Sequence, residues 1–279
     1  MLSLVSLFTL KKNNLNILVT GGNGFIGTNF IKTLISKGYN VFNIDNLTYA
    51  AGKNNHSELS KNSKYFFVKG DICDPELIKN ALNEFHPNYI INFAAESHVD
   101  NSIKSSSEFI KSNILGTFNL LEHSKNYHFS LDEKKKSIFR FHQISTDEVY
   151  GDMENELFHE NSQYRPSSPY SASKASADHL VQAYVRTYKV DAVISNCCNN
   201  YGPYQFPEKL IPLMILNACE GKSLPIYGDG SNIRDWLHVE DHCSGIFSVL
   251  KEGRMGETYC IGGASEKTNM EVINTLCEI

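Results

Sequence analysis

The chain has 279 residues, of which 41% are hydrophobic and 20% are charged, as in a globular protein with a large core. Its net charge of -5 provides no basic surface of the kind that binds nucleic acid. The seven cysteines include no Cys-x-x-Cys pair. This pattern indicates reduced thiols in the cytoplasm, with neither a disulfide framework nor a metal site.

We expect residues 1–14 to form an N-terminal extension ahead of the first strand. Residues 1–10 are apolar but too few to span a bilayer. They also lack the basic start and small-residue cleavage site of a signal peptide. A membrane anchor and a secretory leader are therefore not expected.

A strand predicted at residues 16–20 runs into a glycine-rich turn, Gly-Gly-Asn-Gly-Phe-Ile-Gly, and then an amphipathic helix. In such units one glycine makes the tight turn, one lets the backbone approach a pyrophosphate, and one lets the helix pack on the strand. The helix N-terminus adds N–H donors and a partial positive charge. The candidate residues for binding a cofactor here are Gly21, Gly24, Phe25, Ile26 and Gly27.

Four residues at later strand ends extend this candidate cofactor site. Asp45 lies about 20 residues past the glycines, where a carboxylate accepts hydrogen bonds from ribose hydroxyls. A carboxylate there repels a 2′-phosphate, so NAD is favoured over NADP. Asp71 is a candidate acceptor for the adenine amino group, and Ile72 would pack on the adenine ring. Ala94 is small enough to let the cofactor cross the strand ends.

The alternation of strands and helices predicts an α/β fold with a doubly wound parallel (Rossmann) sheet and a smaller C-terminal α/β lobe. Parallel strands with right-handed crossovers place all their carboxyl ends on one edge, where ligands bind. We expect an NAD-binding domain at residues 15–195, and a substrate-binding lobe, interleaved with it, at 196–279. Further strands are predicted at 41–44, 65–68, 89–93, 138–144, 191–195 and 258–261, and helices at 75–85, 109–124, 171–188 and 237–250.

Two distant segments carry the groups best suited to catalysis. Thr146, Asp147 and Glu148 follow the predicted strand at 138–144 and therefore lie at the ligand-binding edge of the sheet. Tyr170 and Lys174 are four residues apart and lie on one helix face. A neighbouring ammonium favours a phenolate, so Lys174 is expected to lower the pKa of Tyr170 and make it a base near neutral pH.

The second half of the chain offers polar groups for a diphosphate or sugar. Residues 196–212 are predicted to be a loop because they contain a Gly-Pro pair. Residues 225–228 are predicted to be an edge strand that carries an aromatic residue. Lys209 and Arg234 are candidate phosphate ligands, since a guanidinium can hold a diphosphate bidentately. Taken singly, each of them is a surface charge as often as not.

With these segments assembled, the chain resembles the extended short-chain dehydrogenases/reductases, and more narrowly the dTDP-glucose 4,6-dehydratases. The resemblance covers residues 16–279 and is most specific at 145–151 with 170–174, at 199–212 and at 232–241. It implies an NAD-dependent hydro-lyase that acts on a nucleoside-diphosphate glucose, with dTDP-glucose as first choice and UDP-glucose second. It also implies a cytoplasmic homodimer joined by a four-helix bundle, made from helices near 107–124 and 171–188 of each copy.

The resemblance implies a role for each catalytic residue. Tyr170, as a phenolate, takes the proton of the sugar 4-hydroxyl, to which Thr146 is hydrogen-bonded, while a hydride passes from carbon 4 to NAD. Glu148 then removes the carbon 5 proton, Asp147 protonates the departing 6-hydroxyl, and the hydride returns to carbon 6. Lys174 completes the catalytic set. Two neighbouring carboxyls can act as acid and base at once, because like charges at short range push their pKa values apart.

The same resemblance assigns a set of residues to substrate binding: Ser97, Thr146, Asn199, Lys209, Leu210, Tyr227 and Arg234. Three positions depart from the family pattern, because Asn101 stands where Arg is frequent, Cys260 where Asn is usual, and Ser265 where Asn commonly contacts substrate. The family continues well past a position like Ile279, so we expect the C-terminal lobe to be truncated.

Two alternatives stay open at this point. A nucleotide-sugar epimerase or decarboxylase shares the cofactor site and the Tyr-Lys pair, but the acid pair Asp147 and Glu148 argues against it. An NAD-binding regulatory protein without turnover is the non-enzymatic alternative. The presence of Thr146, Asp147, Glu148, Tyr170 and Lys174 together argues against that loss of function.

Overall fold

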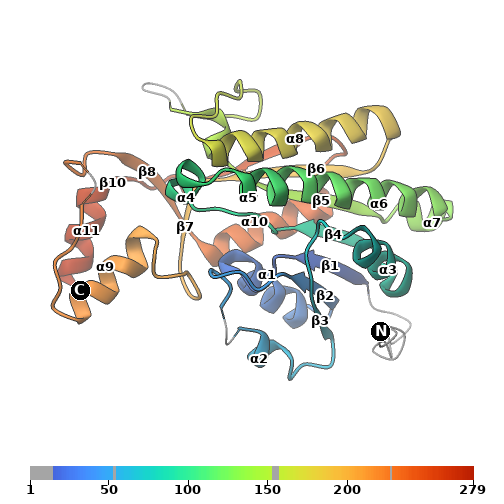
Figure 1. Cartoon of the computed structure of the whole chain (residues 1–279), viewed down its shortest axis with the longest axis horizontal. Coiled ribbons are helices and arrows are strands. Elements are labelled where there is room, and N and C mark those ends of the chain that lie inside the picture. Colours follow the sequence, from blue (N-terminus) through green and yellow to red (C-terminus); the bar gives the residue numbers. More distant parts are fainter. Residues whose placement is uncertain (1–14, 53–54, 153–156, 227) are drawn as a thin grey trace.

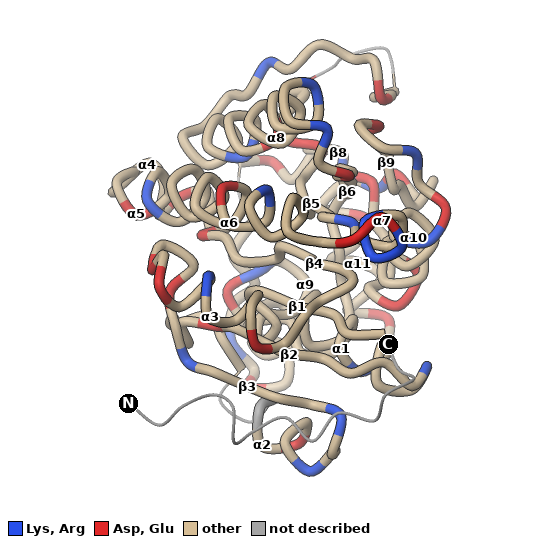
Figure 2. The backbone as a smooth tube through the Cα atoms, turned by 90° about the vertical axis from the view of Figure 1, so that its right-hand side faces the viewer, with Lys and Arg blue, Asp and Glu red and all other residues tan. Residues whose placement is uncertain are grey.

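The computed structural model describes residues 15–52, 55–152, 157–226 and 228–279. The expected extension at 1–14 and the candidate Tyr227 therefore lie outside the described residues. Basic and acidic residues are interspersed over the described part of the chain (Figure 2). In these same ranges, every helix is too short or too polar to cross a bilayer.

The main sheet has seven parallel strands in the order β3-β2-β1-β4-β5-β6-β9. The first six positions have the strand order of a dinucleotide-binding sheet. The strands are β1 (Asn16–Thr20), β2 (Asn40–Asp45), β3 (Tyr65–Lys69), β4 (Tyr89–Asn92), β5 (Arg140–Thr146), β6 (Ala192–Cys197) and β9 (Thr258–Ile261). Their bounds lie within two residues of the predicted ones.

Helices cover both faces of this sheet, which confirms the predicted doubly wound fold (Figure 1). Along β1, Leu18 packs into the core on one face, while Ile17 and Val19 pack into the core on the other, as expected for alternating side chains. The first core is covered by α3 (Pro75–Phe85), α6 (Thr117–Ser130) and α8 (Pro169–Tyr188), and the second by α1 (Phe25–Ser36) and α10 (Val239–Glu252).

Local capping fixes where two of these helices begin. The Asp74 carboxylate accepts hydrogen bonds from the N–H groups of Glu76 and Leu77, and Pro75 occupies the first turn of α3. Ser168 forms a reciprocal capping box with Ser171 at the start of α8. The second cap places Tyr170 in the first turn of α8, next to the sheet edge.

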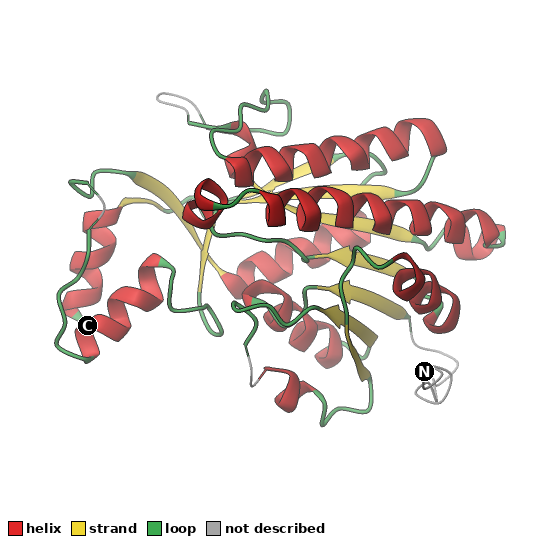
Figure 3. Cartoon of the chain, viewed as in Figure 1, coloured by secondary structure: helices red, strands yellow, loops and turns green. Residues whose placement is uncertain are grey.

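A smaller sheet of three strands, β10-β8-β7, lies beyond the carboxyl edge of the main sheet (Figure 3). It consists of β7 (Asn199–Tyr201), β8 (Ile233–His238) and β10 (Glu266–Thr268), with α9 (Leu210–Cys219) and α11 (Asn269–Glu278) beside it. β9 returns to the main sheet, and α10 packs on its core. The range 196–279 thus contributes to both sheets.

Three local predictions in this half were wrong. The predicted loop at 196–212 contains β7 and the first turn of α9. The edge strand predicted at 225–228 is not seen in its described part, since residues 225, 226 and 228 belong to no strand. The helix predicted from 237 begins at Val239, because residues 237–238 complete β8, where long-range pairing overrides the local pattern.

The helix predicted at 109–124 is longer and irregular. It runs as α5 (Ser107–Phe109), a π-helical segment η2 (Ile110–Gly116) and α6. The remaining short helices are α2 (Asn55–Leu59), α4 (Val99–Lys104), α7 (Glu133–Lys136) and the 3-10 turn η3 (Asp147–Tyr150). π-helical segments within α-helices occur frequently at functional sites.

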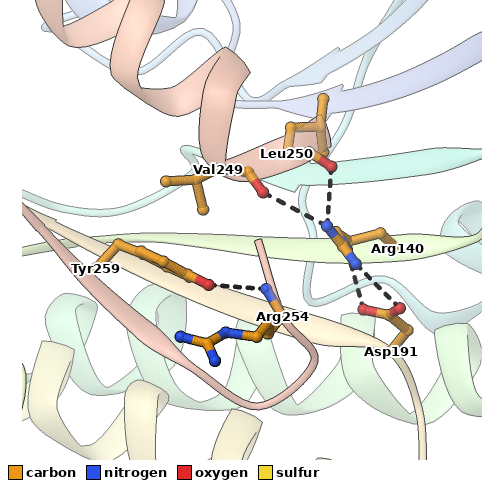
Figure 4. Close-up of polar contacts among 6 residues, drawn as sticks. All are labelled: Arg140, Asp191, Val249, Leu250, Arg254 and Tyr259. Carbon is orange, nitrogen blue, oxygen red and sulfur yellow. Dashed lines mark hydrogen bonds and ion pairs between the residues drawn. The ribbon is translucent and has the colours of Figure 1, made fainter. Parts of the chain in front are cut away.

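A partly buried arginine holds together the amino edge of the sheet (Figure 4). The Arg140 guanidinium donates to both carboxylate oxygens of Asp191, from Nε at 3.0 Å and from Nη2 at 3.2 Å. Its Nη1 donates to the carbonyl of Leu250 at 3.1 Å, near the end of α10. One side chain thus joins β5, the start of β6 and the carboxyl end of α10, where a cation is also favoured by the helix dipole.

Replacement of Arg140 by Leu is expected to destabilise the fold by about 2 to 3 kcal/mol, because it leaves the Asp191 carboxylate and a helix-end carbonyl without a donor. Urea denaturation measures the change. Arg254→Leu is the matched control, since Arg254 donates to the Tyr259 hydroxyl through its backbone N–H, which the substitution keeps (Figure 4). Equal effects of the two substitutions would contradict this role for Arg140.

Candidate active site

A cavity of about 380 Å³ opens at the carboxyl edge of the main sheet, facing the smaller sheet. It brings together residues from the glycine-rich turn, the later strand ends, the segments at 146–148 and 170–174, and the second half of the chain. The candidates that line it are Gly21, Gly24, Phe25, Ile26, Gly27, Asp45, Asp71, Ile72, Ala94, Ser97, Thr146, Asp147, Glu148, Tyr170, Lys174, Asn199, Lys209 and Leu210. Among described candidates, Arg234 alone lies outside it.

The glycine loop forms one wall, and each glycine has a distinct geometric reason. Gly21 has a positive φ of 69°, and a Cβ there would lie 2.6 Å from the backbone N of Ala94. A Cβ on Gly27 would lie 2.5 Å from the carbonyl of Gly21. A Cβ on Gly24 would meet only that carbonyl, at 3.3 Å, so this position stays open toward the cavity. The three roles predicted for these glycines, a tight turn, room for a pyrophosphate and close packing of the helix, fit this geometry.

Asp45 joins this loop to the end of β2. Its carboxylate accepts hydrogen bonds from the N–H groups of Asn23 and Leu47, both at 2.8 Å. Burial raises its pKa, and these two donors oppose the shift. Asp71 accepts from the N–H of Cys73 at 2.9 Å and pairs with Lys111 at 3.5 Å. Both carboxylates therefore lie at strand ends on the cavity wall, as predicted.

Thr146 is the last residue of β5, and Asp147 and Glu148 begin the 3-10 turn that follows. The Thr146 hydroxyl donates to Asp147 Oδ1 and accepts from the N–H of Glu148, both at 3.3 Å. Asn196 donates to the Thr146 carbonyl at 3.0 Å. These bonds fix the turn, so both carboxyl groups line one cavity.

The two carboxyl groups differ in their surroundings. Burial raises the pKa of Asp147 to about 6, and the negative charge of Glu148 adds to that shift. Burial also raises the pKa of Glu148, but Lys209 and Arg234 oppose it. The surface of Glu148 is accessible to solvent, because this residue lines the open cavity. The arrangement therefore favours a proton on Asp147 and a negative charge on Glu148.

Because the folded pKa of Asp147 lies above its ordinary value of 3.8, folding favours its protonated form. The associated stability is present at low pH and is lost as the pH rises from about 4 to about 6. Asp147→Asn is therefore expected to stabilise the fold at pH 8 by roughly 2 kcal/mol, and to have little effect at pH 4. Urea denaturation at the two pH values measures this, and equal effects at both would contradict it.

Tyr170 lies in the same cavity, with its phenol beside the Thr146 hydroxyl. Its ring packs edge-on against Phe109, with centroids 6.3 Å apart. The expected lowering of its pKa by Lys174 is wrong for this structure. Burial raises the pKa of Tyr170 well above its ordinary value, the carboxylates of Glu148 and Asp147 add to the increase, and the Thr146 hydroxyl opposes it.

The position of Lys174 explains this difference. Its ammonium donates to the carbonyl of Ile144 at 2.6 Å. Burial lowers its pKa, and the Asp178 carboxylate on the next turn opposes that shift. Lys174 thus lines the cavity, but its charge interacts mainly with groups of β5 and α8 rather than with the phenol. Helical spacing places the two residues on one face without fixing where the ammonium bonds.

The remaining substrate candidates lie in the loop after β4 and in the segments from β7 to β8. Lys209 donates to the Ser97 carbonyl at 3.2 Å and precedes Leu210 at the start of α9. Arg234 lines an adjoining cavity of about 200 Å³, to which Asn199 and Leu210 also contribute. The two cavities therefore share part of one wall. Tyr227 cannot be placed, since it lies outside the described residues.

Sequence reasoning missed Asn113 in the π-helical segment, whose side-chain amide forms a bracket of hydrogen bonds between two other segments. Its amide oxygen accepts from the N–H of Glu96 at 2.8 Å, and its amide nitrogen donates to the Glu96 carbonyl at 3.0 Å and to Ser173 Oγ at 2.8 Å. Ser173 donates in turn to the carbonyl of Tyr170 at 2.6 Å. The bracket ties the loop after β4 to the helix that carries Tyr170.

Other cavity residues were also missed, including Glu96, Glu208 and Cys197. The rule that ligands bind at strand ends would have found Glu96, which follows β4, and Cys197, which ends β6. Glu208 contacts His98 and Tyr49 from a loop that only the folded chain brings near. In the ranges that the structure describes, no group of three or more His, Cys, Asp or Glu could hold a metal ion.

The family model described as GDP-mannose 4,6 dehydratase matches residues 18–279. A dTDP-glucose 4,6-dehydratase of Haemophilus influenzae is 55% identical over 268 residues, which cover 95% of this chain and 79% of that relative. A crystal structure of dTDP-glucose 4,6-dehydratase from Bacillus anthracis with NAD is 48% identical with a TM-score of 0.85, covering 95% of this chain and 80% of that one. The Streptomyces venezuelae enzyme of the same name, also with NAD, is 44% identical with a TM-score of 0.88 and the same coverage of both chains.

Proposed function

Since the chain belongs to the GDP-mannose 4,6 dehydratase family, and within it to the dTDP-glucose 4,6-dehydratases, we propose that it dehydrates dTDP-glucose to the 4-keto-6-deoxy sugar nucleotide. The single observation that carries the chemistry is the shared cavity of Tyr170, Asp147 and Glu148. A phenol and two unlike carboxyl groups there can act on carbons 4, 5 and 6 of one hexose.

NAD is the cofactor, and it supplies the acceptor and later the donor of a hydride. The residues present fit this group. The open Gly24 position and the first turn of α1 offer backbone N–H groups for the pyrophosphate. Asp45 offers its carboxylate to the ribose hydroxyls at the end of β2, and Asp71 and Ile72 border the place for the adenine ring.

The residues of the chain divide the reaction between them. Tyr170, as a phenolate, accepts the proton of the sugar 4-hydroxyl, and Thr146, beside it, holds that oxygen. The positive charge of the oxidised cofactor, when bound, would favour this phenolate and oppose the effect of burial. The resulting 4-ketone acidifies the proton on carbon 5. Glu148, whose negative charge Lys209 and Arg234 favour, removes that proton. Asp147, which keeps its proton to about pH 6 in the free protein, donates it to the departing 6-hydroxyl.

Substrate binding is assigned to the loop after β4 and to residues of the second half of the chain. We propose that Lys209 and Arg234 neutralise the diphosphate, while Ser97, Asn199 and Leu210 border the sugar and its phosphates. Two adjoining cavities suit a substrate with two parts, a hexose at the reacting groups and a nucleotide farther along.

Separate incubation with dTDP-glucose and UDP-glucose tests the function. We expect dTDP-glucose to give a 4-keto product that absorbs in alkali, and UDP-glucose to give much less. A greater yield from UDP-glucose would reassign the nucleotide. A galactosyl isomer would support an epimerase, and binding of NAD without any product would support a regulatory protein.

We further propose that the protein is a cytoplasmic homodimer. The segment α5–η2–α6 and helix α8 lie side by side on one face of the sheet, as a four-helix bundle between two copies requires (Figure 1). Apolar side chains remain exposed on the first segment, at Ile110, Leu115 and Phe118. Phe118→Glu is expected to shift the protein to monomers in sedimentation, whereas Phe129→Glu, near the far end of α6, serves as the control.

A further inference from the structure

Helix α8 carries a third buried polar residue in line with Tyr170 and Lys174. Asp178 lies four residues beyond Lys174, so the three side chains occupy one helix face at successive turns. Asp178 is fully buried, and Lys174 is nearly so, with 5% of its surface exposed. Buried carboxylates and ammonium groups are rare unless they interact with each other or with several donors.

Asp178 joins three separate segments. Its Oδ2 accepts hydrogen bonds from Ser145 Oγ on β5 at 2.7 Å and from the Tyr164 hydroxyl at 3.1 Å. Within the residues that the structure describes, its Oδ1 is buried without a hydrogen-bond donor. The carboxylate therefore has one oxygen bonded to neighbouring segments and one without such a bond.

Lys174 and Asp178 form hydrogen bonds with consecutive residues of β5. Lys174 bonds to the Ile144 carbonyl, and Asp178 bonds to the Ser145 hydroxyl. Thr146 follows directly, and then the acid pair. These two contacts set the position of α8, with its phenol, relative to the strand end that carries the carboxyl groups.

Charge links the two residues as well. Burial disfavours the ammonium of Lys174, and Asp178 is the carboxylate that opposes this most strongly. Burial likewise raises the pKa of Asp178 to about 6, with Lys174 as the largest opposing influence. Among the described residues, five other titratable groups influence the pKa values of Lys174, Asp178 and Tyr170. They are Asp147 and Glu148 on η3, Cys197 on β6, His179 on α8 and Tyr164 in the loop before α8.

We propose that Asp178 is a positioning residue, whose negative charge keeps Lys174 protonated and in place at the cofactor site and so holds the Tyr170 helix in register with Thr146–Glu148. This inference rests on the proposed function, because it assigns Lys174 to the cofactor. Asp178 itself lies behind the cavity wall and is not among the residues that line the cavity.

The test measures NAD affinity by calorimetry and single-turnover rate, each against pH. Asp178→Asn keeps an oxygen for Ser145 and Tyr164 but removes the charge, so Lys174 loses its proton at lower pH. We expect both quantities to fall at a pH that is lower than in the wild type by at least about one unit. Near pH 9 this shift corresponds to an NAD affinity about tenfold lower than that of the wild type. Asp178→Glu, which keeps the charge, should leave the alkaline fall at its wild-type pH.

Two results would overturn the proposal: coincident pH profiles for Asp178→Asn and the wild type, or an equal shift in Asp178→Glu. If the Asn variant does not fold, Asp178→Ser takes its place, because it also removes the charge and keeps a polar oxygen near Ser145. Its alkaline fall of NAD affinity should move to lower pH in the same way. A profile that coincides with that of the wild type would contradict the proposal.

Failure of the proposed function would look different. If the wild type binds NAD but forms no ketone from either sugar nucleotide, the dehydratase assignment fails. The pH profile of NAD affinity still decides the role of Asp178 in that case, because it does not depend on turnover.

Discussion

Replacement of Tyr170 by Phe is expected to lower the rate of sugar oxidation at carbon 4 by about 10³-fold, because it removes the proton acceptor for the 4-hydroxyl. The ring contact with Phe109 and the start of α8 do not depend on the hydroxyl, so folding and NAD binding should be retained. A single turnover with dTDP-glucose, followed by the absorbance of the reduced nicotinamide, measures the step.

Tyr150→Phe is the matched control for this substitution. Tyr150 is also a buried phenol near the end of β5, but it contacts Cys260 and packs against Phe158 and Tyr164 outside the cavity lining. The control should oxidise the sugar at nearly the wild-type rate. Equal losses in both variants would mean that Tyr170 acts through packing, and its assignment as the base would be abandoned.

The second large effect is expected from Asp147→Asn combined with Glu148→Gln. Water loss requires an acid on the 6-hydroxyl and a base on carbon 5, so the double variant should lose at least about 10³-fold in dehydration. Oxidation at carbon 4 depends on Tyr170 and should persist. The product mixture, analysed by mass after quenching, should contain the 4-keto sugar that still has its 6-hydroxyl.

The single variants separate the two roles. Glu148→Gln should abolish exchange of the carbon 5 proton with deuterated water, whereas Asp147→Asn should permit this exchange but slow water loss. Asp152→Asn serves as control, because Asp152 is an exposed carboxylate that acts on Glu148 from outside the cavity lining. Exchange that persists in Glu148→Gln would show that another group is the base.

Much of the fold could be predicted because local signals and burial agree. The start of α3 at Pro75 follows from the Asp-Pro cap, and β1 follows from an apolar run that ends in glycines. The smaller C-terminal lobe was expected, but the three strands of its sheet were not, because they are short and pair only across long stretches of sequence. Trp236, for example, lies opposite Asn199 in the ladder of β7 and β8.

The candidate site was predictable in membership but not in electrostatics. Strand ends and helical spacing gather the glycines, Asp45, Tyr170 and the acid pair at one edge. They do not reveal that Lys174 bonds to the Ile144 carbonyl, or that burial raises the pKa of Tyr170. Those properties depend on contacts between distant segments, and so does the position of Arg234 in the adjoining cavity.

The proposed mechanism requires that one enzyme-bound hexose is oxidised, dehydrated and reduced before it is released. The most direct measurement follows deuterium placed on carbon 4 of dTDP-glucose, mixed with unlabelled substrate of a distinguishable mass. We expect the deuterium at carbon 6 of the same sugar molecules that carried it at the start. Deuterium retained at carbon 4, lost to water or transferred to the unlabelled sugar would contradict this account.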